Sequence, residues 1–238
     1  MHDPLATTTR PLLPGQRFPG LGLGRQVASV MEQMAEKSHV TDGLLNFPFH
    51  FYQSIAYSAR GYKHIDPVYE AYTKWMQSQL GPFLAEHGFC FVAWGVSMGF
   101  CRRITEVSIA SEGRDEGSEV EKGKEEWKIV SSRLERYSPQ EQIYSTSPSM
   151  ASFMNSKEYV RLYEKYLKIL MKDGGANLEG VDMVSAAEHL GSTSVENAAP
   201  GGGRKRSRLI IDIENCPELW KYSENPLYRT RNPETGEL

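Results

Sequence analysis

The sequence predicts a mixed α/β or α+β fold, in which helices flank a partly antiparallel sheet. Two observations carry this prediction. Apolar residues recur with helical spacing in residues 24–37 and 156–172, whereas they alternate with polar residues in residues 104–109 and 127–134. The chain has 238 residues, of which 39% are hydrophobic and 24% charged, so its composition is sufficient for one main core.

The N-terminal elements follow from helix signals and chain breakers. An extended lead-in with several prolines, residues 1–16, precedes a helix over residues 24–37. The helix carries one apolar stripe, formed by Val27, Val30, Met31 and Met34. A short buried strand is expected at residues 44–47, and a second helix at residues 51–59 that ends at Gly61.

A third helix is predicted to start at Asp66 and Pro67, because Asp caps helices and Pro suits their first position. Its inward face consists of Val68, Tyr72, Trp75, Met76 and Gln79. Gly81 and Pro82 end this helix, and a short helical turn follows to His87.

The spacing of apolar residues along the sequence changes after this turn. Residues 89–98 are rich in aromatic and β-branched residues and predict a strand, which is followed by antiparallel strands at residues 104–109 and 127–134. The intervening residues 111–126 are acidic and nearly free of apolar side chains, which is typical of a mobile hairpin loop. Two tryptophans are expected to pair across these strands, Trp94 and Trp127.

The C-terminal part begins with the helix over residues 156–172, which completes a main domain of residues 17–173. Residues 174–208 are rich in Gly, Ser, Ala and Glu and predict a flexible linker. Residues 209–213 form a last strand candidate, and the whole of 209–238 is interpreted as a strand plus an extended tail.

Charge and composition restrict the function classes. A formal net charge of −3 gives no electrostatic argument for nucleic acid as a partner, and no apolar run of about 18 residues predicts a membrane span. The cysteines are too few for a disulfide framework or a zinc site, so we expect free thiols and a reducing, cytoplasmic compartment; they are Cys90, Cys101 and Cys216. The basic residues 204–208 predict either a nuclear-import signal or a basic hinge. The prolines of the lead-in disfavour a mitochondrial transit peptide.

A glycine-rich turn stands directly before the first helix. Gly20, Gly22 and Gly24 occupy alternate positions, and Arg17 completes the pattern R-x-x-G-x-G. Glycine lets a phosphate approach the backbone, and the helix N-terminus adds unpaired N–H groups and partial positive charge. Arg25 follows in the first turn and could pair with a phosphate. The alternative is a tight helix-entry turn without a ligand.

This stretch resembles the acyl-CoA binding signature of the GNAT N-acyltransferase superfamily, R/Q-x-x-G-x-G/A. The resemblance covers residues 16–66 and continues through a helix, a short strand and a second helix that ends in Tyr57, Gly61 and Tyr62. It implies an acyltransferase that binds acetyl-CoA or another acyl-CoA and acts on an amine, without a metal, or a truncated or degenerate form that binds coenzyme A without turnover. The residues that would hold the pyrophosphate are Arg17, Gly20, Gly22, Gly24 and Arg25.

The resemblance also implies catalytic roles. Tyr57 would act as the general acid that protonates the leaving thiolate, for which a phenol with a pKa near 10 is suited. His50 stands where the family usually has an asparagine, and His50 and Glu70 are candidates for the base by residue type alone.

Two further functions remain open from the sequence. The first is a non-catalytic interaction or assembly subunit that contacts a protein partner, or a second copy of itself, through residues 209–238. The second is a small-molecule cyclase, isomerase or dehydratase with a cone-shaped α+β fold, because several helices are followed by strands.

Overall fold

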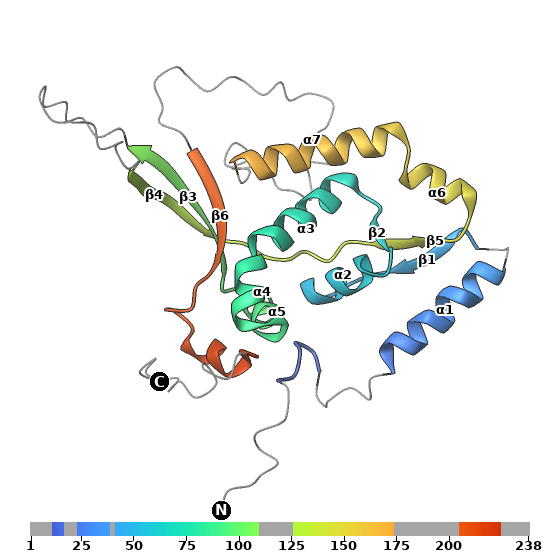
Figure 1. Cartoon of the computed structure of the whole chain (residues 1–238), viewed down its shortest axis with the longest axis horizontal. Coiled ribbons are helices and arrows are strands. Elements are labelled where there is room, and N and C mark those ends of the chain that lie inside the picture. The colour runs from blue at the N-terminus through green and yellow to red at the C-terminus, as the bar shows by residue number, and fades with distance from the viewer. Residues whose placement is uncertain (1–10, 17–22, 39–40, 110–125, 174–204, 225–238) are drawn as a thin grey trace, which may run out of the picture.

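The computed structural model describes residues 11–16, 23–38, 41–109, 126–173 and 205–224 (Figure 1). Its α-helices are α1 (Gly24–Ser38), α2 (Phe51–Ser58), α3 (Pro67–Gln79), α4 (Gly81–His87), α5 (Phe89–Ser97), α6 (Pro148–Met154) and α7 (Lys157–Asp173). Its strands are β1 (Gly43–Asn46), β2 (Lys63–His64), β3 (Cys101–Ile109), β4 (Glu126–Leu134), β5 (Gln142–Ser145) and β6 (Lys205–Ile211), and a 3₁₀ helix, η2, spans Pro217–Tyr222. The predicted mixture of helices and antiparallel strands is confirmed.

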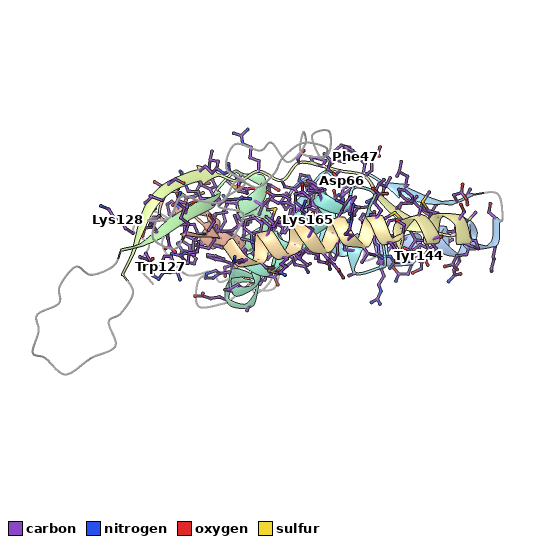
Figure 2. All side chains as sticks on the ribbon, turned by 90° about the horizontal axis from the view of Figure 1, so that it is seen from above. Phe47, Asp66, Trp127, Lys128, Tyr144 and Lys165 are labelled. Atoms are coloured by element: carbon purple, nitrogen blue, oxygen red, sulfur yellow. The ribbon has the colours of Figure 1, made fainter. Side chains whose placement is uncertain are left out.

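The strands form two small antiparallel sheets, in the orders β1-β5-β2 and β4-β3-β6. In the first sheet Gly43 pairs with Ser145, and in the second Cys101 pairs with Ile211. Seen from above, the two sheets lie at opposite ends of an elongated arrangement, with Trp127 of β4 at one end and Tyr144 of β5 at the other (Figure 2). Each sheet joins strands that are far apart in the sequence, β1 with β5 in the first and β3 with β6 in the second.

The core lies around α3, between the two sheets. Asp66 caps this helix, and its Oδ1 accepts a hydrogen bond from the N–H of Val68 at 2.8 Å. The predicted inward residues Val68, Tyr72, Trp75 and Met76 are buried, whereas Gln79 is half-buried. Helix α7 lies along α3 and contributes the fully buried Leu170 (Figure 1). The third predicted helix and its orientation are therefore confirmed.

The prediction of a strand at residues 89–98 is wrong, because this segment forms α5. The segment is apolar on all sides, so its sequence has no period that separates a buried helix from a buried strand. Gly88 has a φ of +86° and lets the chain turn from α4 directly into α5. Trp94 consequently stacks on Tyr222, with ring centroids 4.6 Å apart, and does not pair with Trp127. Trp127 lies instead under the guanidinium of Arg206, 4.0 Å from the ring centroid.

The C-terminal boundaries also differ from the prediction. The last strand begins at Lys205 and not at residue 209, so the end of the predicted linker, residues 205–208, belongs to a sheet. Arg206 and Arg208 pair with Glu106 of β3 at 2.8 and 3.2 Å, which corrects the interpretation of the basic run as a hinge. The rest of the predicted linker, nearly all of the acidic loop and residues 225–238 of the tail lie outside the described residues.

The start of the predicted tail belongs to the core. Within η2, Leu219 is fully buried and Trp220 is 8% exposed.

At the other end of the chain, α1 forms as predicted, but it packs through Glu32 and Ala35. Its apolar stripe is more than half exposed at Val27, Val30, Met31 and Met34. The strand expected at 44–47 also forms, as β1, although Leu45 is 61% exposed and the strand is not buried.

Candidate functional site

Part of the predicted CoA-binding set meets in one cavity. Gly24 begins α1, Arg25 follows it, and Tyr57 lies on the last turn of α2; all three line a cavity of about 680 Å³, which we call the α1–α2 cavity. The other predicted phosphate ligands, Arg17, Gly20 and Gly22, lie outside the described residues. The α1–α2 cavity thus brings together residues from two separate segments of the chain.

The two arginines of the α1–α2 cavity differ in their surroundings. The Arg60 guanidinium donates to both carboxylate oxygens of Glu32, at 2.8 and 2.5 Å, and to Ser29 Oγ at 2.9 Å. The hydrogen bond to Glu32 raises the pKa of Arg60. Arg25 is exposed and has no hydrogen-bond or ion-pair partner among the described residues. Arg25 is therefore the cation of this cavity that remains available for an anion.

The predicted base His50 does not share this cavity with Tyr57. It stands before α2, where its backbone N–H donates to Gln53 Oε1 at 3.1 Å and its ring stacks on that of Tyr52. Its Nδ1 lies 3.4 Å from Ser97 Oγ, and the residue lines a different cavity. The structure therefore places His50 at the opposite end of α2 from Tyr57 and does not bring the two predicted catalytic residues together.

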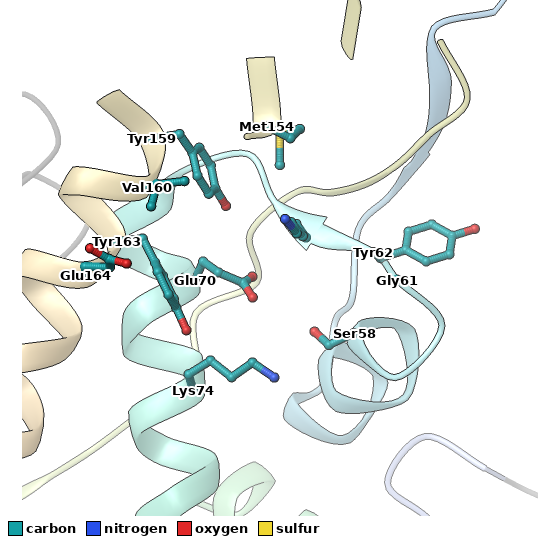
Figure 3. A pocket seen from close by; sticks show the side chains of 11 residues that line it. Ser58, Gly61, Tyr62, Glu70, Lys74, Met154, Tyr159, Val160, Tyr163 and Glu164 are labelled. Atoms are coloured by element: carbon teal, nitrogen blue, oxygen red, sulfur yellow. The ribbon is translucent and has the colours of Figure 1, made fainter. Parts of the chain in front are cut away.

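A second cavity, of about 360 Å³, surrounds Glu70, the other base candidate, and we call it the Glu70 cavity. Figure 3 shows the Glu70 carboxylate, the Lys74 ammonium and the Tyr163 hydroxyl directed toward the same space, with Ser58 across from them. Glu70 is only 8% exposed, and its Oε2 accepts a hydrogen bond from the N–H of His64 at 2.9 Å. Burial raises the pKa of Glu70, against the lowering effects of this N–H and the nearby lysine charges.

The residues that share the cavity with Glu70 are not predicted from the sequence. Lys74 lies one turn further along α3, and Tyr159 and Tyr163 lie one turn apart on α7. The Tyr159 hydroxyl donates to the carbonyl oxygen of His64 at 2.6 Å, so it holds β2 against α7. Burial raises the pKa of both tyrosines. The residues of each pair are four apart in the sequence, which places them on one face of their helix. That the two faces meet depends on the packing of α3 on α7, which the sequence does not show.

A buried polar cluster lies behind the Glu70 cavity. His64, Ser54 and Gln142 are all fully buried, and His64 Nε2 lies 3.0 Å from Ser54 Oγ and 3.2 Å from Gln142 Nε2. A serine beside a histidine is also the arrangement of a nucleophilic pair, but these atoms are closed off from any substrate. Burial lowers the pKa of His64 to about 4, so the ring is neutral at pH 7. The cluster fixes β2, whose backbone N–H binds Glu70.

The neutral, buried His64 predicts a loss of stability in acid. Its folded pKa of about 4 lies below the unfolded value of 6.5, so the unfolded chain binds the extra proton between these values. The free energy of unfolding should therefore decrease by about 3 kcal/mol from this group as the pH falls from about 7 to about 4. Glu70, whose folded pKa is raised, acts in the opposite direction, because its protonation in acid favours the folded state.

Urea unfolding of the wild type and of His64→Gln across this pH range isolates the histidine contribution, since Glu70 is common to both. The difference in free energy between the two proteins should shrink as the pH falls. An equal pH dependence in both proteins would show that His64 does not carry this effect.

No match to this chain was found among models of known protein families, curated proteins or solved structures. None of the helices in the described residues is both long enough and apolar enough to cross a membrane. The same part of the chain contains no group of three or more His, Cys, Asp or Glu side chains arranged to hold a metal ion.

Proposed function

We propose that the chain is an acyltransferase that binds acyl-CoA in the α1–α2 cavity and acts on an amine. The observation that supports this most is the meeting of Gly24, Arg25 and Tyr57 around one cavity of about 680 Å³. The resemblance to the GNAT superfamily assigns these three residues, from separate segments of the chain, to the binding and catalysis of acyl-CoA. The volume lies within the range of small-molecule and cofactor sites.

The residues of this cavity suit the parts of such a ligand. The N-terminus of α1 contributes partial positive charge through the helix dipole, and Arg25 adds a full positive charge beside it, so together they would bind a pyrophosphate. Bound acyl-CoA supplies a thioester whose carbonyl carbon an amine can attack. Tyr57 would donate its hydroxyl proton to the departing sulfur as the C–S bond breaks and the amide C–N bond forms. The proton that the amine nitrogen loses in this step would pass to water, and water would return a proton to the Tyr57 phenolate. Arg60 would hold α1 against α2 at this cavity through its ion pair with Glu32.

We expect the wild-type chain to bind coenzyme A and Arg25→Ala to bind it about tenfold more weakly, because one charge-assisted hydrogen bond to the phosphate is lost. Tyr57→Phe should keep this affinity but lose acetyl transfer to amines. Isothermal titration calorimetry with coenzyme A, and release of free thiol from acetyl-CoA in the presence of an amine panel, measure the two effects.

The matched control is Lys37→Ala, which removes one exposed cation from the opposite end of α1 and should leave coenzyme A binding unchanged. A folded wild-type protein that does not bind coenzyme A at about 1 mM would overturn the proposal. So would equal losses of affinity in Arg25→Ala and Lys37→Ala, because the effect would then be one of net charge.

A second candidate function is a non-catalytic interaction or assembly subunit. The observation that favours it is the exposed apolar stripe of α1, formed by Val27, Val30, Met31 and Met34. An amphipathic helix that turns its apolar side outward is typical of a contact surface. Absence of coenzyme A binding in the folded wild type would favour this candidate over the acyltransferase.

A further inference from the structure

The Glu70 cavity contains a buried carboxylate that the described residues satisfy only in part. Glu70 is 8% exposed, and its Oε2 accepts the single hydrogen bond found for this side chain, from the N–H of His64. Among the described residues no group donates to the other oxygen, Oε1, and none forms an ion pair with Glu70. A buried charge is costly unless it is paired, so this oxygen is suited to a positively charged group from a ligand.

Lys74 supplies the opposite charge in the same cavity. It lies one helical turn from Glu70, yet its ammonium has no hydrogen-bond or ion-pair partner among the described residues (Figure 3). The cavity's other lysine, Lys63, already donates to Asn155 Oδ1 at 3.0 Å. An anionic ligand would be repelled by Glu70, and a purely cationic one by Lys74. A ligand that carries both charges satisfies both side chains.

The remaining walls suit a small organic molecule. Tyr159 and Tyr163 line the cavity from α7 and Met154 from α6, so they provide apolar surface and aromatic rings next to the carboxylate. Aromatic rings attract ammonium groups through their π faces, and they also pack against apolar side chains. The volume of about 360 Å³ lies at the lower end of the range for small-molecule sites and leaves room for an amino acid.

We propose that the Glu70 cavity binds a small zwitterion of the amino-acid type, with its ammonium group on Glu70, its carboxylate on Lys74 and its side chain against Tyr159 and Tyr163. This site is separate from the α1–α2 cavity, since Ser58 lines one cavity and Tyr57 the other. The proposal therefore does not depend on coenzyme A binding.

The test is ligand-observed NMR with the wild-type protein and pools of the common L-amino acids, each at about 10 mM. Isothermal titration calorimetry then gives the affinity of the strongest ligand, of its decarboxylated amine and of its N-acetyl derivative. Each derivative lacks one of the two charges and should bind about tenfold more weakly or worse. Absence of binding from all pools would overturn the proposal, and so would an amine that binds as tightly as the amino acid.

Two variants connect the ligand to the cavity. Glu70→Gln keeps an oxygen for the N–H of His64 but removes the charge, and Lys74→Met keeps the length of the side chain; each should weaken binding about tenfold. Glu158→Gln is the matched control, because Glu158 is an exposed acidic residue of α7 outside the cavity. Circular dichroism shows whether each variant is folded. Unchanged affinity in folded Glu70→Gln would place the ligand elsewhere and reject the site.

Discussion

A chain that ends after Ile213 should fail to fold, whereas one that ends after Glu224 should fold and unfold cooperatively. The residues between these two ends include Leu219, which is fully buried, and Trp220, which is 8% exposed. The Trp220 ring lies 5.8 Å from that of Phe91 in α5. Loss of a buried leucine and a buried tryptophan costs about 2–5 and 3–5 kcal/mol respectively, which together approach the whole stability of a typical domain.

Hydrogen bonds add to this loss. The Glu224 N–H donates to the carbonyl oxygen of His87 at 2.7 Å, and Glu224 Oε1 accepts from the N–H of Cys90 at 3.0 Å. These bonds fix the junction at Gly88 where α4 turns into α5. The shorter deletion retains all of them, because it removes only residues outside the described structure.

Urea unfolding followed by far-ultraviolet circular dichroism compares the two truncated chains with the full chain. Leu219→Ala in the full chain is the local control and should lower the free energy of unfolding by about 2–5 kcal/mol. Equal unfolding midpoints for the two truncated chains would contradict the prediction. The result also affects any test of a C-terminal docking tail, since a deletion that starts at residue 214 would remove core residues, whereas one that starts at 225 leaves every described core residue in place.

Glu135→Ala is expected to destabilise the fold by about 3–5 kcal/mol, because it leaves a buried arginine without its carboxylate. Arg103 is 2% exposed, and its Nη2 donates to Glu135 Oε1 at 2.9 Å. The Tyr72 hydroxyl donates to the same oxygen at 2.5 Å. The Arg103 guanidinium also lies 4.5 Å from the centroid of the Trp75 ring, so it is enclosed by the core and cannot turn toward water.

Chemical denaturation of the wild type and Glu135→Ala at neutral pH measures this loss. The control is Glu218→Ala, which breaks an exposed ion pair with Lys221 and should cost only about 0–1 kcal/mol. Replacement of the whole polar group by Tyr72→Phe, Arg103→Met and Glu135→Leu together should cost less than Glu135→Ala alone, since no buried charge remains. A triple variant that is less stable than Glu135→Ala would show that the ion pair contributes net stability.

Sequence reasoning succeeded where the signal is local. The start of α3 is encoded by Asp66 and Pro67, and the observed bond from the Val68 N–H to Asp66 confirms the cap. Helices α1 and α7 are encoded by another local signal, apolar residues that recur with helical spacing over many residues. The strand pair β3 and β4 is predicted because apolar and polar residues alternate along each of the two segments.

Sequence reasoning failed where neighbours decide the structure. Residues 89–97 have no period because α5 is covered on all sides, and the basic residues of β6 become sheet residues because Glu106 of β3 offers them a partner. The apolar stripe of α1 is exposed, whereas Glu32 of the same helix faces inward, where Arg60 binds it. In the site, Glu70 was named by residue type alone, since its burial depends on how α7 packs on α3.

The order of the strands along the chain has a consequence for biosynthesis. Strands β1 and β2 find their shared partner only when β5 has been translated, and β3 receives its second neighbour only when β6 has been translated. Until then a nascent chain on the ribosome presents open strand edges and the uncovered apolar surface of α3 and α5. Contacts at such long sequence separation slow folding. Productive folding in the cell is therefore expected to be largely post-translational and to benefit from chaperones that shield these edges.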